Sequence, residues 1–157
     1  MTRPSRPRSR RGAPVRAALT LALVAGSLGC ATKVSTRAFE VVAAPNANRN
    51  SPVPVDVVLV RAEPLVAAVS VLSADEWFQG REQLLKDHPA DLEVRSWELV
   101  PGQILEIDRF PFPSRKGFAL VVFADYLSDG VHRLRVDPLR EFRLILNVDG
   151  FEAQETR

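Results

Sequence analysis

The stretch FALVVFADY, residues 118–126, is apolar almost throughout. A short apolar run between turn-forming segments is typical of a strand that is buried on both faces of a sheet. Before it, FPFPSRKG (residues 110–117) has the composition of a loop, and after it Ser128-Asp129-Gly130 predicts a turn into VHRLRV. We therefore expect residues 118–126 to form a central strand.

Two further strands are predicted from the same kind of pattern. EFRLILNV (residues 141–148) precedes Asp149-Gly150, a hairpin signal before a short final strand. VPVDVVLVRA (residues 53–62) places apolar side chains on one face, namely Val53, Val55, Val57 and Leu59. Pro54 cannot donate a ladder hydrogen bond, so this end of the strand is expected at a sheet edge or outside the ladder.

A first strand and a polar loop precede these. KVSTRAFEVVA (residues 33–43) is rich in β-branched residues and predicts a strand that stops before Pro45. APNANRNSP (residues 44–52) consists of turn formers, and asparagine tolerates the left-handed backbone that turns require. We expect a loop here between two strands.

The pattern changes after Glu63. Pro64 and the following LVAAVSVL predict either a short helix with proline in its first turn or a further strand. Ser73-Ala74-Asp75-Glu76 is a capping box, and the helix that it begins is expected to end at His88-Pro89.

LEVRSWEL (residues 92–99) and QILEID (residues 103–108) return to strand patterns, joined by a tight turn at Val100-Pro101-Gly102-Gln103. Seven or eight strands with one helical insertion at about residues 63–88 predict a mainly β protein, a two-sheet β-sandwich.

The amino terminus has the layout of a secretory signal. Six arginines and no acidic residue come before Cys30, and the apolar run AALTLALVAGSL (residues 17–28) is too short to span a bilayer. The run leads into Cys30, the only cysteine, which looks like a bacterial lipobox with Ser27 where leucine is usual. We expect residues 1–29 to be removed and Cys30 to be acylated. The alternative is a free structural cysteine in a soluble domain.

Charge excludes one class of partner. The chain has 21 basic and 19 acidic side chains, and six of the basic ones precede Cys30, which leaves 15 basic and 19 acidic ones and a net charge of −4. Residues 30–157 fit a single domain that has no basic face for nucleic acid, so no nucleic-acid partner is expected.

The order of segments resembles a known family. A lipoprotein signal is followed by SPVPVDVVLV, a helical insert with SADEWFQGREQLL, then SWELVPGQ and GFALVVFADY. This order resembles the TssJ family, the outer-membrane lipoproteins of the bacterial type VI secretion system. Asp56 departs from the family pattern, in which a more basic or apolar stretch is expected at this strand.

The resemblance implies a transthyretin-like β-sandwich, anchored by lipid on the periplasmic face of the outer membrane, that binds the periplasmic domain of the inner-membrane protein TssM. Ala31, rather than aspartate, follows Cys30, which also favours the outer membrane. In the family, the loop between the first two strands contacts TssM. In this chain, that loop would present Asn46, Ala47, Asn48, Arg49 and Asn50. The alternative is a solvated hairpin loop, and Phe110 and Phe112 either cover the end of the sandwich or form a second partner patch.

No catalytic residues, metal site or cofactor are predicted, apart from covalent lipid on Cys30. His88 at a helix end and His132, expected to face water, have no companion at metal-ligand spacing. Glu106 and Asp108 are expected on a solvated strand face, and packing of helix against sheet accounts for Trp77 and Trp97. The alternative function is a periplasmic β-sandwich lipoprotein that binds a small ligand or glycan.

Overall fold

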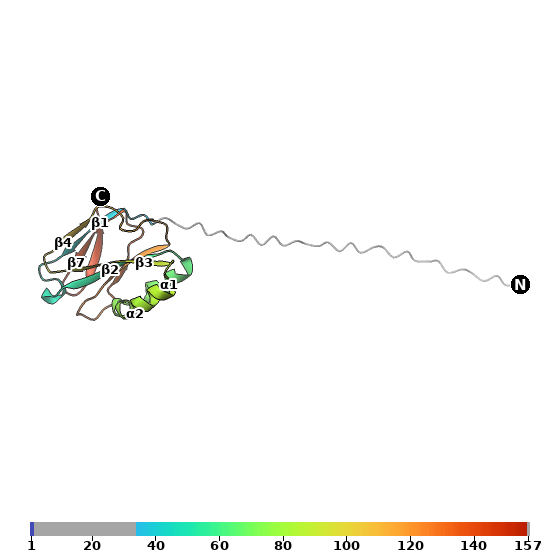
Figure 1. The fold of residues 1–157 in the computed structure, drawn as a ribbon, viewed down its shortest axis with the longest axis horizontal. Helices are drawn as coiled ribbons and strands as arrows, with labels where there is room; N and C mark the ends of the chain where they lie inside the picture. Colours follow the sequence, from blue (N-terminus) through green and yellow to red (C-terminus); the bar gives the residue numbers. More distant parts are fainter. Residues whose placement is uncertain (2–33, 157) are drawn as a thin grey trace.

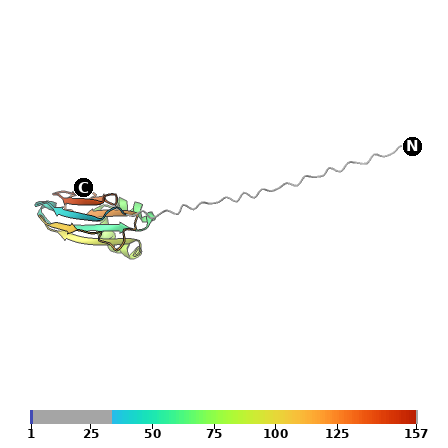
Figure 2. The same ribbon diagram turned by 90° about the horizontal axis from the view of Figure 1, so that it is seen from above.

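The computed structural model describes Met1 and residues 34–156. The predicted signal peptide and Cys30 lie outside the described residues. Two four-stranded sheets pack face to face, and two helices cover the outer face of one of them (Figures 1 and 2). The predicted β-sandwich with a small helical insertion is confirmed.

The two sheets are named here after their central strands. The β1 sheet has the order β4-β1-β7-β8 and contains β1 (Ala38–Ala43), β4 (Ile104–Ile107), β7 (Glu141–Leu146) and β8 (Phe151–Glu155). The β5 sheet has the order β3-β2-β5-β6 and contains β2 (Val53–Val60), β3 (Leu92–Leu99), β5 (Ala119–Ala124) and β6 (Arg133–Arg135).

β5 is the central strand that the apolar run predicts. All its residues are buried, because one face of the strand packs into the sandwich core and the other packs under the helices. It pairs antiparallel with β2 on one side and with β6 on the other.

β2 lies beside β5 and has the predicted face. Its alternate residues Val53, Val55, Val57 and Leu59 belong to the core between the sheets. Pro54 is not at a sheet edge, since it pairs with Glu98 of β3. Its carbonyl accepts a hydrogen bond of 2.9 Å from Asp125, just beyond the end of β5. The N–H that proline lacks would point to that same side and donate to the carbonyl of Asp125, so the one bond that is lost lies just beyond the ladder between β2 and β5.

The other face of β2 supports the helices. α1 (Glu63–Val71) has Pro64 in its first turn, which decides between the helix and the strand expected for this segment. α2 (Ala74–Asp87) begins at the predicted capping box and ends before His88, its C-cap. Trp77 is fully buried and stacks on Phe123 of β5, with ring centroids 5.0 Å apart.

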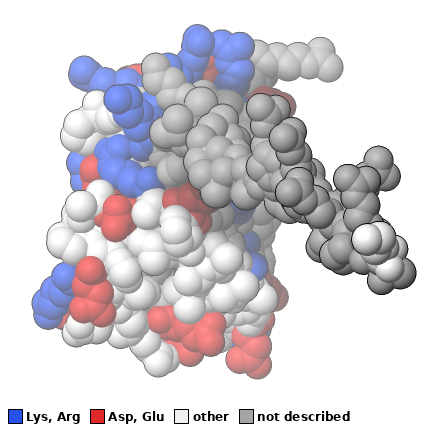
Figure 3. All heavy atoms as spheres, turned by 90° about the vertical axis from the view of Figure 1, so that its right-hand side faces the viewer, with Lys and Arg blue, Asp and Glu red and all other residues white. Residues whose placement is uncertain are grey.

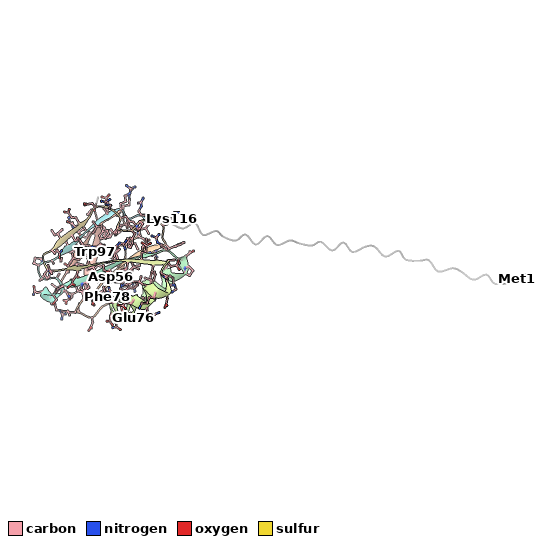
Figure 4. The ribbon with its side chains drawn as sticks, in the orientation of Figure 1. Met1, Asp56, Glu76, Phe78, Trp97 and Lys116 are labelled. Carbon is pink, nitrogen blue, oxygen red and sulfur yellow. The ribbon has the colours of Figure 1, made fainter. Side chains whose placement is uncertain are left out.

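Trp97 does not pack helix against sheet as predicted. It lies opposite Val55 in the register of β2 and β3, and its ring meets Phe39 of β1 edge-on at 6.2 Å. It therefore belongs to the core between the two sheets. Figure 4 shows Asp56 between Trp97 on one side and Phe78 and Glu76 of α2 on the other.

The sandwich has two ends, named here by their segments. The loop end comprises residues 44–52, 100–103, 125–132 and 147–150, and the amino-terminal end comprises residues 34–37, 108–118 and 136–140. β2 has eight residues and runs between these ends, a distance of about 26 Å at about 3.3 Å per residue. In Figure 1 the described chain enters at the upper right, and residues 44–52 (teal) lie at the lower left.

Candidate partner-binding surface

Residues 44–52 cross from one sheet to the other. β1 and β2 belong to different sheets, so this loop is not the hairpin that the alternative interpretation assumed. It contains a short 3₁₀ segment, Ala47–Asn50, in which Asn48, Arg49 and Asn50 have φ values of 46°, 54° and 64°. Asparagine adopts this left-handed backbone more readily than most residues. The run of asparagines is therefore explained in part by the shape of the loop.

The five residues predicted to meet a partner divide into two groups. Ala47 is completely buried and Asn48 is only 3% exposed, whereas Asn46, Arg49 and Asn50 are exposed. Only the second group presents its side chains at the surface of the domain.

Asn48 joins three segments of the loop end. Its side-chain Nδ2 donates to the carbonyl of Pro52 at 2.8 Å, and its Oδ1 accepts from the backbone N–H of Leu127 at 2.7 Å. Its own N–H donates to the carbonyl of Asn147 at 3.0 Å. A buried amide with this many partners fixes the relative positions of these segments.

Two further contacts hold the loop end together. Arg49 donates to Asp149 across the surface, with Nε to Oδ1 at 2.9 Å. The hydroxyl of Tyr126 donates to the carbonyl of Gly150 at 2.8 Å, and burial raises the pKa of Tyr126. These contacts, together with those of Asn48, connect the loops of this end.

The turn at residues 100–103 adds to this surface. The N–H of Gly102 donates to the carbonyl of Ala43 at 3.0 Å, and Gly102 has a φ of 82° that glycine adopts without strain. The turn is the predicted one, but it carries the chain from β3 in one sheet to β4 in the other. It therefore lies beside residues 44–52.

Exposed apolar side chains gather at this end. Large apolar side chains within residues 34–156 that remain strongly exposed are Val71, Val100, Ile104, Leu127 and Val131. Val100 and Ile104 flank the turn just described, and Leu127 follows Tyr126 and bonds Asn48. The carbonyl of Val131 accepts from Ala74 at 2.8 Å, at the junction that follows Val71 and α1. A concentration of exposed apolar groups around rigid polar loops is typical of a protein-binding surface.

Sequence patterns did not reveal Leu127 or Ile104 as surface residues. Both lie in or next to strand patterns, and apolar residues in such patterns are normally assigned to the core. Their exposure follows from where β4 and β5 begin and end, which the pattern defines poorly.

His132 is not the water-facing strand residue that alternation predicted. It precedes β6, has a φ of 41°, and stacks on Tyr126 with ring centroids 4.8 Å apart. Its Nε2 lies 2.8 Å from the carbonyl oxygen of Ser128. This histidine therefore shapes the loop of residues 125–132.

Phe110 and Phe112 lie at the amino-terminal end. Phe112 is 5% exposed and belongs to the sandwich core, against which Phe110 packs partly buried. The guanidinium of Arg95 lies 5.1 Å from the ring centre of Phe112 and donates to the carbonyl of Pro111 at 3.0 Å. This geometry fits the covering role rather than a second partner patch.

No group of three or more His, Cys, Asp or Glu side chains within residues 34–156 is placed to hold a metal ion. Glu106 and Asp108 are exposed at β4, as expected of a solvated face. Of the helices that the structure describes, none has the length and apolar character needed to cross a membrane.

Solved structures share this fold. The type VI secretion lipoprotein TssJ1 from Pseudomonas aeruginosa matches 78% of this chain and 98% of its own, with 18% identity and a TM-score of 0.58. Serratia marcescens Lip, a membrane-bound component of the type VI secretion system, matches 78% of this chain and 99% of its own, with 14% identity and a TM-score of 0.51. A chain in the structure of the TssM C-terminal domain from EAEC matches 76% of this chain and 100% of its own, with 16% identity and a TM-score of 0.55.

No protein-family model and no curated protein sequence matches the chain. At these identities the structural similarity shows a common fold. The fold expected from the TssJ resemblance is therefore confirmed.

Proposed function

We propose that this chain is a TssJ-like lipoprotein of a type VI secretion membrane complex, which binds the periplasmic domain of TssM through its loop end. The role is one of anchoring and assembly, and it requires no catalytic residue. Support comes from the fold shared with type VI secretion lipoproteins and from the segment order that resembles the TssJ family.

The observation that carries the proposal is the composition of the loop end. Exposed Asn46, Arg49 and Asn50 lie on a loop whose backbone is held by buried Asn48. Exposed apolar side chains, among them Leu127 and Ile104, lie around it. Interfaces commonly combine an apolar centre with a polar rim that supplies hydrogen bonds.

The lipid anchor is the second part of the proposal. Cys30 would carry the acyl chains, which hold the domain on the periplasmic face of the outer membrane. One acyl chain gives only marginal membrane binding, so stable anchoring takes two or more. A bacterial lipoprotein cysteine with several chains makes the anchor permanent and leaves the protein contact as the reversible part.

The test is the affinity for the purified TssM periplasmic domain. The variant Asn46→Ser/Arg49→Gly/Asn50→Gly removes the exposed side chains and leaves Asn48 in place. Glycine suits the left-handed backbone of Arg49 and Asn50, so circular dichroism should remain that of the wild type. We expect the dissociation constant to rise at least tenfold, about 1.4 kcal/mol.

The control is Arg109→Gly, an exposed position of the amino-terminal end. Its affinity should equal that of the wild type. An unchanged affinity of the triple variant would remove residues 44–52 from the interface and overturn the proposal.

A further inference from the structure

Main-chain hydrogen bonds bring three arginines together at the amino-terminal end. The N–H of Val34 donates to the carbonyl of Arg115 at 3.0 Å, and the N–H of Arg37 donates to the carbonyl of Arg140 at 2.8 Å. The first described residues are thus held between the loop that carries Arg115 and the segment that leads into β7. Three positively charged side chains from distant parts of the sequence become neighbours.

These arginines surround an open hollow of about 290 Å³, lined by Val34, Ser35, Arg37, Arg115 and Arg140. No acidic side chain lines it. Lys116 is exposed next to Arg115, and Figure 4 shows it at the edge of the domain where the described chain begins. Arg37, Arg115, Lys116 and Arg140 are called the basic end below.

The charges of the basic end are not neutralised by ion pairs. The ion pairs within residues 34–156 involve other arginines, namely Arg49, Arg61, Arg81, Arg135 and Arg143. Asp137, the acidic residue that lies nearby, is paired with Arg135. Glu141 of β7 and Glu155 of β8 lie beside Arg140 in a neighbouring hollow, but neither glutamate forms an ion pair with Arg140, and neither lines the hollow between the arginines.

The basic end is positively charged, whereas the domain as a whole has a negative net charge. The chain from Cys30 onward has a net charge of −4, yet Lys and Arg gather in the upper half of the face shown in Figure 3. Asp and Glu lie mostly in its lower half. This separation of positive and negative side chains gives the domain a preferred orientation at a charged surface.

The basic end is also the part of the domain nearest to the predicted anchor. Cys30 lies four positions before Val34 in the sequence. Four residues span at most about 14 Å even when fully extended. If Cys30 is acylated, Val34 and the hollow beside it must therefore lie close to the headgroups of that leaflet.

We propose that the basic end binds the phosphates of anionic phospholipid headgroups, and that this contact orients the sandwich on the membrane. The inference rests on the lipid anchor of the proposed function. Guanidinium groups bind phosphate in a bidentate manner, and basic side chains at an anionic surface add their attractions. The contact turns the loop end away from the membrane, so that residues 44–52 reach toward the periplasm.

The test uses the chain from residue 30 with Cys30→Ser, which cannot be acylated. All strands, both helices and both apolar cores lie within residues 34–156, so this chain keeps the whole described fold. Its sedimentation is measured with phosphatidylcholine vesicles that do or do not contain phosphatidylglycerol. We expect binding only to the anionic vesicles, and weaker binding as salt is added.

The decisive comparison is between two double variants of equal charge. Arg37→Gln/Arg140→Gln should bind anionic vesicles at least about tenfold more weakly, given the attraction of each basic side chain to such a surface. Lys86→Gln/Arg133→Gln removes the same charge from α2 and β6, outside the basic end, and should bind like the parent chain. Equal losses in the two variants, or no binding of the parent chain to anionic vesicles, would overturn the inference.

A further measurement distinguishes a lipid headgroup from free phosphate as the ligand. Binding of inorganic phosphate to the parent chain in the absence of vesicles, together with no binding to the anionic vesicles, would show a site for the free ion and contradict the headgroup assignment. Because this chain carries no lipid and needs no TssM, its result is independent of the proposed function. Failure of TssM binding or of Cys30 acylation appears instead in the affinity and fractionation experiments.

Discussion

The carboxylate of Asp56, 1% exposed on β2, accepts a hydrogen bond from the indole Nε1 of Trp77 at 2.8 Å. The same oxygen accepts one from Arg81 of α2 at 2.7 Å, while the other carboxylate oxygen has no partner within the described residues. Asp56 interrupts the apolar pattern of β2 because it connects α2 to the β5 sheet. The departure from the family pattern that the sequence shows at this position is thus structural.

Asp56→Ala should destabilise the fold by about 3 kcal/mol, because it leaves the buried Trp77 N–H without an acceptor and Arg81 without its ion pair. Asp56→Asn retains an acceptor for Trp77 and should cost about 1 kcal/mol. Urea unfolding measures both. Arg143→Ala, which breaks an ion pair of partly exposed side chains with Glu40, serves as control and should cost less than about 1 kcal/mol. Equal costs for all three variants would contradict the role of Asp56.

Asn48 should be the residue of the loop end on which stability depends most. Asn48→Ala removes both side-chain hydrogen bonds and places a β-carbon in left-handed backbone, at a cost of about 2 to 3 kcal/mol. Asn48→Gly relieves the backbone and should cost about 1 kcal/mol less. Thermal or urea unfolding of the two variants measures whether Asn48→Gly is the more stable one. Asn46→Ala at an exposed position should stay within about 0.5 kcal/mol of the wild type, and a larger loss there would show that the whole loop is structural.

The capping box of α2 should give stability that depends on pH. Ser73 donates to Glu76 from its backbone N–H at 2.7 Å, and this bond, with that from the Ser73 hydroxyl, lowers the pKa of Glu76. A lowered pKa in the folded state stabilises the protein above the pKa of the unfolded chain, and this stabilisation is lost as the pH falls through the folded pKa. The stability difference between wild type and Glu76→Gln should therefore be present at about pH 7 and shrink progressively as the pH falls below the ordinary pKa of a glutamate.

The matched variant is Glu82→Gln, an exposed position further along α2. Its stability relative to the wild type should change little over the same range. A constant difference for Glu76→Gln at all pH values would show that its carboxylate charge is irrelevant to the cap.

Local signals in the sequence predicted most of the fold. The apolar run of β5, the capping box at Ser73 and the asparagines of residues 44–52 each determine local structure through their own chemistry, and each is found as expected. Which strands pair with one another was harder to predict from the sequence. The turn at residues 100–103 fixes a change of direction, but not that β4 joins β1 in the other sheet.

The candidate surface depends on such long-range relationships. Asn48 is buried because Leu127, distant in the sequence, donates to its side chain, and the partners of Asp56 are 21 and 25 residues away. No spacing in the sequence encodes these contacts. Exposure of Leu127 and burial of Phe112 likewise follow from where strands end, so composition alone could not separate partner surface from core.

Cys30→Ser should release the protein from the outer membrane. Without the thiol no acyl chain is attached, and the remaining sequence offers only the apolar run of residues 17–28, which is too short to span a bilayer. Flotation of cell envelopes on a density gradient checks the location. Ser27→Leu, which restores the usual lipobox leucine, should leave the protein in the outer-membrane fraction. Recovery of Cys30→Ser in that fraction would contradict the lipid anchor.

Leu127→Asp should weaken TssM binding without unfolding the sandwich. The side chain is 66% exposed, so its replacement leaves the core intact, while the backbone N–H that donates to Asn48 remains. A carboxylate at an apolar interface loses its hydration without a partner, which should raise the dissociation constant at least tenfold, about 1.4 kcal/mol. Ala90→Asp adds the same charge at an exposed position between α2 and β3 and should leave the affinity unchanged. If both variants bind TssM like the wild type, the apolar side chains of the loop end are not the contact, and only the polar residues 46, 49 and 50 remain as its candidates.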